Sequence, residues 1–317
     1  MKISHLIVAA GAACLAGAAS AQWVADPAFN SKSNAQSIQI SAGSTITGNS
    51  TAQANGTYFL AEVGAAPLAI YRHRLVFESD TLNQRGWIKG LQQTASGDIV
   101  PDTDVLVQAT SLPATKPSLY NQWYGFGKGE RFYYQVFGTA ATTADYTITM
   151  DTEVVTPDVL GSFLPGQISI STIDQGHTST THIHVYDANL NPIPGYSNIR
   201  PDSSTFQSLL TREYDPGTYY LAIGLRNTAN DQATPDDTIT RNQPVMDFGG
   251  MLINGQPTAG NQDVSFSITD GIGTYAFDAE RGGNYGVYWA TFTIVPTPGS
   301  AALLGVMALL GARRRRA

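Results

Sequence analysis

The sequence is nearly free of cysteine and low in charge. One residue of 317 is Cys, and only 14% of the residues are charged. That residue, Cys14, lies in a segment that we expect to be removed, so the mature chain would have no disulfide, thiolate nucleophile or cysteine-ligated metal. The 42% hydrophobic content is ample for a packed core, which excludes a wholly disordered chain.

Basic residues are scarce outside the two ends. Five of the 18 basic residues are Lys2 and Arg313 to Arg316, which leaves 13 basic against 25 acidic residues for the rest of the chain. An acidic body does not capture nucleic acid or anionic lipid by electrostatic attraction. We therefore expect no nucleic-acid partner.

Enzyme signatures are missing as well. The sequence has no Gly-x-Ser-x-Gly, His-Glu-x-x-His or Walker-type motif. Gly125, Gly127 and Gly129 do not predict a phosphate cradle, because no helix-forming run follows them. We predict that the chain is not an enzyme. A polysaccharide hydrolase that uses two carboxylates is the enzymatic alternative, although no pair of acids stands out.

Residues 1–21 have the pattern of a secretory signal peptide. Lys2 gives a positive start, residues 6–17 are apolar, and Ala19-Ser20-Ala21 offers small residues before Gln22. The apolar stretch is shorter than the roughly 20 residues that a membrane-spanning helix needs. The pattern predicts export with cleavage between Ala21 and Gln22.

The C-terminus combines a proline motif, an apolar run and a basic cluster. It reads Val295-Pro296-Thr297-Pro298-Gly299, then residues 301–311, then Arg313, Arg314, Arg315 and Arg316. This tail resembles the PEP-CTERM class of bacterial sorting signals, although Thr297 stands where the family motif has Glu. The resemblance implies a short hydrophobic sorting helix over 296–317, an exosortase-like processing enzyme, transient membrane contact and a location at the envelope surface or outside the cell.

Between these ends the pattern is that of β-strands. No stretch sustains an apolar period of 3.6 residues, whereas short alternating runs recur between turn residues. Tyr71, His73, Leu75 and Phe77 share one strand face, with Arg72 and Arg74 on the opposite face. The sequence predicts an all-β fold.

A weak internal repeat divides the body in two. Leu164-Pro165-Gly166 echoes an earlier strand start at 41–47, and each half closes with Thr-Pro, at Thr156-Pro157 and Thr297-Pro298. We expect two tandem β-sandwich domains, residues 22–157 and 158–295, each of ordinary domain size.

The second half carries two phrases with a family resemblance. His184-Val-Tyr-Asp-Ala-Asn-Leu-Asn-Pro-Ile193 and Tyr214-Asp-Pro-Gly-Thr-Tyr-Tyr-Leu-Ala-Ile223 resemble the bacterial pre-peptidase C-terminal domain. The resemblance covers about residues 158–240. It implies a jelly-roll-like β-sandwich and a non-catalytic accessory role.

One candidate metal site lies in the first phrase. Asp187, Asn189 and Asn191 have the spacing that opens an EF-type calcium loop, but Pro192 stands where that loop needs Gly. The favoured alternative is a hairpin turn in which these side chains bond to nearby backbone amides. A looser calcium site would add Asp202 or an acidic loop. The residues of that loop are Asp231, Asp236 and Asp237.

A second candidate cluster contains His177, His182, His184 and Asp187, with Asp174 upstream. On a strand, His182 and His184 share a face and are spaced to hold a divalent metal. We favour the alternative that both face solvent while Ile183 and Val185 fill the core.

Aromatic residues supply a candidate glycan platform. Trp123 and Tyr124 offer flat faces of the kind that hold sugar rings, with Trp23 and Trp87 elsewhere. The favoured alternative is that Trp123 and Phe126 pack in the core.

The hypothesis that joins these observations is an exported, envelope-sorted surface or extracellular-matrix protein. Its role would be structural or adhesive and non-catalytic, with contacts to exopolysaccharide and no cofactor. The alternative is a calcium- or glycan-binding module.

Overall fold

The computed structural model describes most of the body of the chain. The described residues are 21–51, 56–79, 81, 84–91, 104–108, 110–111, 119–138, 142–201, 204–226, 228–230, 249–254 and 260–296. Residues 1–20, which make up most of the expected signal peptide, the residues from Thr297 onward, and Asp202, Asp231, Asp236 and Asp237 lie outside them. No helix within the described ranges has the length and apolar character that crossing a membrane requires.

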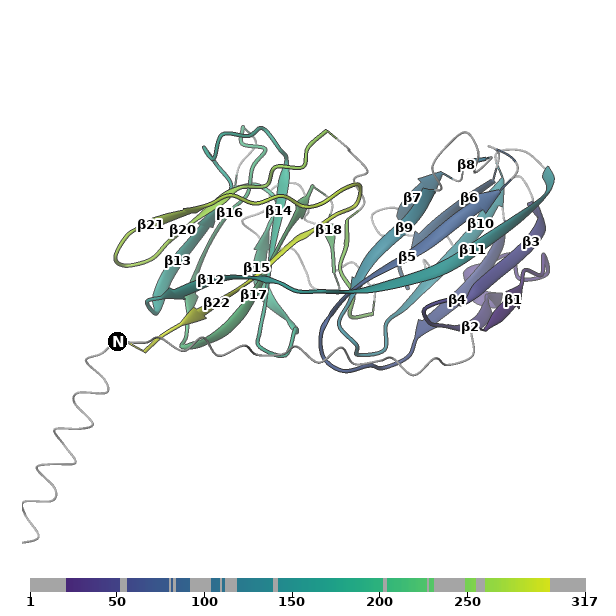
Figure 1. The fold of residues 1–317 in the computed structure, drawn as a ribbon, viewed down its shortest axis with the longest axis horizontal. Helices are drawn as coiled ribbons and strands as arrows, with labels where there is room; N and C mark the ends of the chain where they lie inside the picture. The colour runs from purple at the N-terminus through teal and green to yellow at the C-terminus, as the bar shows by residue number, and fades with distance from the viewer. Residues whose placement is uncertain are drawn as a thin grey trace, which may run out of the picture.

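The prediction of an all-β fold is confirmed. The described chain forms strands and one short 3-10 helix, η1 (Lys32–Asn34). Four larger sheets fall into a first pair within residues 22–155 and a second pair within residues 158–294. Figure 1 shows the two pairs lying end to end along the long axis.

The first sheet pair brings together strands from distant parts of the sequence. One sheet has the order β1-β3-β11-β5-β8, with β9 also on β5, and the other has the order β2-β4-β10-β6-β7. Strand bounds are β1 Gln22–Val24, β2 Gln36–Ile40, β3 Thr45–Thr51, β4 Thr57–Val63, β5 Ile70–Ser79, β6 Gln84–Lys89, β7 Asp104–Gln108, β8 Thr110–Ser111, β9 Leu119–Gly125, β10 Arg131–Gly138 and β11 Thr142–Val155.

The second sheet pair has the orders β12-β22-β17-β14-β15 and β16-β13-β20-β21, and a short ladder joins β18 to β19. Strand bounds are β12 Asp158–Phe163, β13 Gly166–Ser171, β14 Thr181–Tyr186, β15 Pro192–Asn198, β16 Leu209–Tyr214, β17 Gly217–Leu225, β18 Thr228–Ala229, β19 Ile253–Asn254, β20 Phe266–Thr269, β21 Thr274–Phe277 and β22 Tyr288–Ile294.

Each pair encloses its own apolar cluster, and alternation along the strands builds it. In β5, Leu75 and Phe77 are buried while Arg72 and Arg74 lie on the other face, as the period-two pattern predicts. The first cluster draws side chains from both sheets, including Ile148 of β11 and Phe132 of β10. The second cluster is separate and is built from strands of the second pair.

The chain passes from one pair to the other over two residues. Strand β11 ends at Val155, and β12 begins at Asp158 after Thr156 and Pro157. In Figure 1, β11 runs across the first pair and leads directly toward β12.

Candidate functional site

The two sheet pairs meet in a third apolar cluster. Phe126 and Tyr124 come from the first pair, and Tyr186 and Trp289 from the second. Ring centroids lie 5.2 Å apart for Phe126 and Tyr186, 5.7 Å for Phe126 and Trp289, and 5.6 Å for Tyr124 and Trp289. Such tilted and edge-on contacts stabilise aromatic packing beyond the area they bury. We call this contact region the joint.

The joint forms because one sheet of the second pair is buried on both faces. In β14, Ile183 and Val185 point into the second core, while Tyr186 on the other face packs in the joint. All six residues of β14 are buried. The face of β14 opposite the second core carries His182, His184 and Tyr186, so polar side chains are buried there together with the aromatic ring.

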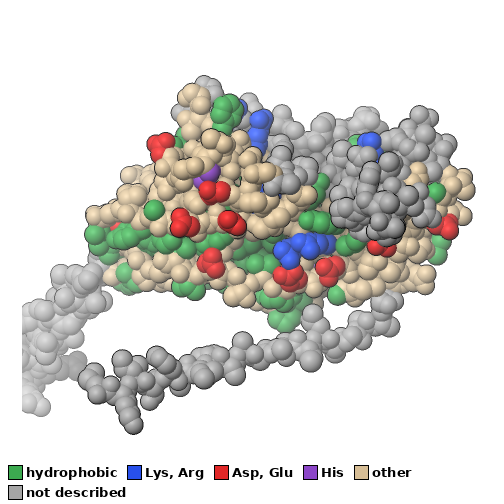
Figure 2. Space-filling model, turned by 45° about the horizontal axis from the view of Figure 1, so that its top comes forward, with side chains coloured by type: hydrophobic (Ala, Val, Ile, Leu, Met, Phe, Trp, Pro, Cys, Tyr) green, Lys and Arg blue, Asp and Glu red, His purple; other side chains and the backbone are tan. Residues whose placement is uncertain are grey.

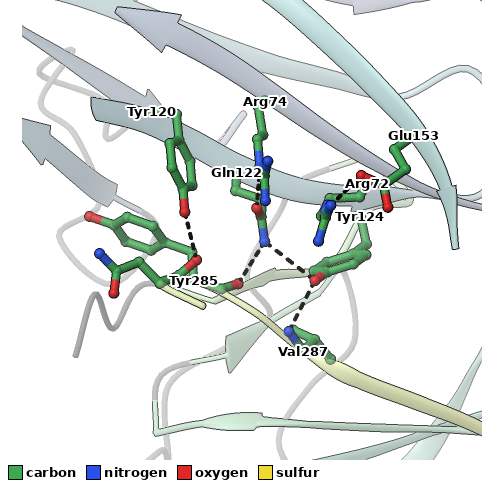
Figure 3. Close-up of polar contacts among 9 residues, drawn as sticks. Arg72, Arg74, Tyr120, Gln122, Tyr124, Glu153, Tyr285 and Val287 are labelled. Atoms are coloured by element: carbon green, nitrogen blue, oxygen red, sulfur yellow. Dashed lines mark hydrogen bonds and ion pairs between the residues drawn. The ribbon is translucent and has the colours of Figure 1, made fainter. Parts of the chain in front are cut away.

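A polar network accompanies the aromatic packing (Figure 3). The Tyr124 hydroxyl accepts a hydrogen bond from the Val287 backbone N–H at 3.0 Å and one from Gln122 Nε2 at 3.3 Å. Gln122 Nε2 also donates to the Tyr285 carbonyl at 3.1 Å. Burial raises the pKa of Tyr124 above its ordinary value, against the opposing effect of the Val287 hydrogen bond.

Charged side chains on the outer face of β5 extend this network. Arg74 Nε donates to Gln122 Oε1 at 2.8 Å, and Arg72 pairs with Glu153 of β11. Figure 3 shows both arginines on the side of the sheet that faces Tyr285 and Val287. On the face of the molecule that Figure 2 shows, the other acidic side chains are spread out and do not form one cluster.

A segment of the second half completes the joint. The backbones of Tyr124 and Leu252 exchange two hydrogen bonds, of 2.7 and 2.8 Å. Met251, Ile253 and Tyr285 belong to the apolar cluster of the first pair. The first core is therefore closed partly by residues that lie beyond the boundary at Pro157.

The Asp187 turn docks against the first pair. Asp187 Oδ1 accepts hydrogen bonds from the backbone N–H groups of Asn189 and Asn191, both at 2.8 Å, and its Oδ2 accepts one from Asn191 Nδ2 at 2.9 Å. Lys128 Nζ donates to Asn191 Oδ1 at 2.7 Å and to the Leu190 carbonyl at 2.9 Å. These are the contacts of the hairpin-turn alternative. The Lys128 ammonium occupies Asn191 Oδ1, one of the three oxygens that the calcium loop would use.

Hydrogen bonds also set the charge state of this turn. Burial acts to raise the pKa of Asp187, but the hydrogen bonds from Asn191 and Asn189 outweigh it and hold the pKa below its ordinary value. Leu190 has a φ of 56°, an uncommon conformation for a non-glycine residue, and its side chain is buried in the joint. The turn is thus fixed at both its carboxylate and its apolar tip.

The expectation that His182 and His184 face solvent is wrong. They are 0% and 3% exposed, and their ring centroids lie 4.1 Å apart. Both share the β14 face that the joint and the nearby Asn230 cover, and His184 Nδ1 lies 3.2 Å from Asn230 Nδ2. The accompanying prediction that Ile183 and Val185 fill the core is confirmed.

The glycan platform at Trp123 and Tyr124 is wrong as well. Trp123 is 0% exposed and Tyr124 is 2% exposed, so neither ring offers a face to a sugar. Trp123 packs edge-on against Phe132 in the first core, and Tyr124 lies in the joint. The favoured alternative of core packing is confirmed for Trp123, whereas Phe126 is buried in the joint instead.

Within the described part of the chain, no group of three or more His, Cys, Asp or Glu is placed to hold a metal. Asp202 and the acidic loop fall outside those residues. Of the sorting motif, only Val295 and Pro296 are described, and the Val295 N–H donates to the Phe163 carbonyl at 3.0 Å.

Three important residues did not stand out in the sequence. Gln122, Lys128 and Glu130 organise the strand β9 and the turn that follows it. The sequence Gly127-Lys128-Gly129-Glu130 was the available sign, because two glycines before a Glu suit a turn whose amides bond to the carboxylate.

A comparison with known protein families finds no matching family model, and one with curated proteins finds no match.

Proposed function

We propose that the chain is an exported, envelope-sorted surface or extracellular-matrix protein with a structural or adhesive, non-catalytic role. Its body consists of two tandem β-sandwich domains, residues 22–157 and 158–295, the second of them jelly-roll-like. The tail over 296–317 is a PEP-CTERM-like sorting signal read by an exosortase-like enzyme. The proposal rests on the sequence of the two ends and on one structural observation.

That observation is the joint. A buried aromatic cluster, a two-bond backbone bridge at Tyr124 and the contacts of Lys128 hold the two sheet pairs together. Domains that swing freely meet through small polar contacts, whereas an apolar contact favours one fixed arrangement. A stiff two-domain body suits a protein that spaces or connects other components.

The positions of the first and last strands agree with removable ends. Strand β1 begins at Gln22, directly after the expected cleavage position, and β22 ends at Ile294, two residues before Pro296. The alternative of a calcium- or glycan-binding module has less support, because Trp123 is buried and the Asp187 oxygens are engaged.

Intact mass measurement with cell fractionation tests the export proposal. We expect native protein in the envelope or the medium with residues 1–21 removed and the arginine tail processed. An Ala21→Asp variant is the matched control, since an acidic residue at that position blocks signal cleavage and should leave the precursor mass. Detection of the unprocessed 317-residue chain in the cytoplasm would refute the proposal.

Calorimetry tests the stiff body independently. We expect one unfolding transition for the wild type, because the first core contains residues from both halves. Trp289→Ala removes the ring that contacts Tyr124, Phe126 and Tyr186, so it should separate the unfolding of the two halves into two transitions. Two transitions already present in the wild type would contradict a fixed joint.

A further inference from the structure

The first sheet pair contains a cavity of about 360 Å³ at one end of its core. This volume lies within the range of pockets that bind small molecules. Its walls are mainly apolar, but the polar side chains Ser41, Tyr71, His73, Glu130 and Thr152 also line it. The apolar wall residues include Ile40, Ala42, Val63, Ala65 and Met150.

Glu130 is an acid held in place by its own turn. Its Oε1 accepts hydrogen bonds from the backbone N–H groups of Phe126 at 2.7 Å and Gly127 at 3.0 Å. The residue is 1% exposed, and its Oε2 is buried with no hydrogen-bond partner among the described residues. Among the described residues, no lysine, arginine or histidine forms an ion pair with Glu130.

His73 lies close to this carboxylate but does not balance its charge. Burial lowers the pKa of His73 to about 4, so the ring is neutral at pH 7. His73 Nδ1 lies 2.9 Å from Thr152 Oγ1, which fixes the ring, and Tyr71 stacks beside it at 5.9 Å. The cavity therefore pairs a carboxylate with a neutral ring.

Gly125 allows the two groups to approach each other. A Cβ atom at this position would lie 2.7 Å from the Glu130 carboxyl carbon and 2.9 Å from His73 Nε2, both too close for a real side chain. Glycine on β9 thus leaves the space that the acid and the imidazole occupy. The arrangement depends on β5 on the one hand and on β9 with the turn that follows it on the other, two segments that are far apart in the sequence.

We propose that this cavity binds an alkylammonium group, with the ammonium on Glu130 Oε2 and the apolar stem against the aliphatic walls. A buried carboxylate without a cation is costly, and a charge-assisted hydrogen bond from an ammonium is the interaction that relieves it. A straight alkyl chain suits apolar walls in the way that a lysine stem covers apolar surface. The group can belong to a free amine or to a lysine side chain of a partner protein.

Calorimetric titration of the full chain at pH 7 tests the charge requirement without any mutation. The probes are n-pentylamine, which is protonated at this pH, and n-pentanol, its neutral analogue of similar size. We expect the amine to bind at least about tenfold more tightly than the alcohol, because only the amine makes a charge-assisted bond. Equal binding of the two, or binding of neither, overturns the proposal.

A pair of variants tests the role of Glu130. Glu130→Gln keeps the shape and removes the charge, so it should abolish the preference for amine over alcohol. Glu213→Gln makes the same charge change at an exposed position of β16 in the second pair and should keep the preference. An unchanged preference in Glu130→Gln overturns the assignment. Should that variant not fold, the wild-type comparison still decides.

A third probe, Nα-acetyl-lysine N-methylamide, separates the two sources of the group. Binding as tight as that of pentylamine would mean that the cavity mouth admits a peptide backbone, which identifies a lysine of a partner protein. Binding of pentylamine alone would identify a free amine. Both results support the alkylammonium assignment, and export of the protein plays no part in either.

Discussion

The turns after β9 and after β14 use the same chemistry with opposite results. In each, one carboxylate oxygen accepts several backbone N–H groups: Glu130 Oε1 from Phe126, Gly127 and Lys128, and Asp187 Oδ1 from Asn189 and Asn191. The second oxygen of Asp187 accepts from Asn191 Nδ2, whereas that of Glu130 is buried with no partner among the described residues. Local hydrogen bonds build a turn, but burial decides whether its acid still has bonding capacity for a ligand.

Removal of the buried acid should give the largest effect. Glu130→Ala leaves the N–H groups of Phe126 and Gly127 buried without an acceptor, and each such loss costs about 1–3 kcal/mol. We expect the free energy of unfolding to fall by about 4 kcal/mol in urea titrations. A loss below that of the matching Asp187 variant would contradict the contrast between the turns.

The free energy of unfolding should also depend on pH through His73, which lies beside Glu130 in the cavity. Its pKa is about 4 in the folded state and near 6.5 when unfolded, so the unfolded state binds the proton first as the pH falls. Its contribution is therefore constant above about pH 6.5 and becomes less favourable by about 3 kcal/mol between pH 6.5 and pH 4.

Urea titrations of wild type and His73→Gln across this window measure the effect. We expect the difference in unfolding free energy between the two proteins to change with pH in the stated sense. A difference that stays constant from pH 7 to pH 4 would show that the ring is not protected from protonation.

Removal of the acid from the exposed Asp187 turn should lower the free energy of unfolding by a smaller amount. Asp187→Ala removes acceptors for Asn189 and Asn191, but water can replace them, so we expect a loss of about 1 kcal/mol. Because the folded-state pKa of Asp187 is below its ordinary value, its contribution is present above about pH 3.8 and is lost as the pH falls further. Denaturant titration at pH 7 and pH 3 checks both statements.

The smallest effect should come from the contact between the two turns. Lys128→Met removes the ammonium that donates to Leu190 and Asn191, and exposed polar contacts contribute about 0.5 kcal/mol. Hydrogen exchange is the more sensitive measurement, since we expect faster exchange of the Asn191 amide. Faster exchange across the whole of β14 would instead mean that the joint itself had opened.

Much of the fold was predictable because strand alternation is a local property. The two faces of β5 and the core residues of β14 follow directly from a period of two. The joint does not follow from this pattern, because alternation assigns one face of each strand to solvent. Alternation therefore predicts that His182 and His184 face solvent, although a second packing partner covers that face.

The candidate sites differ in the same way: one is made of residues that are close in the sequence, and the other is made of residues that are far apart. The Asp187 turn was visible because its three polar residues lie within five positions of each other. The cavity was not, since His73, Glu130 and Thr152 come from β5, from the turn after β9 and from β11. Only the pairing of β5 with β9 and β11 brings them together.

The position of β22 has a mechanical consequence. The strand lies between β12, which runs parallel to it, and β17, which runs antiparallel, and it leads into the chain beyond Pro296. Tension applied to that chain would pull β22 along its own axis. The hydrogen bonds on both flanks would then share the load in shear instead of opening one after another, which is the geometry of a strand suited to bearing force.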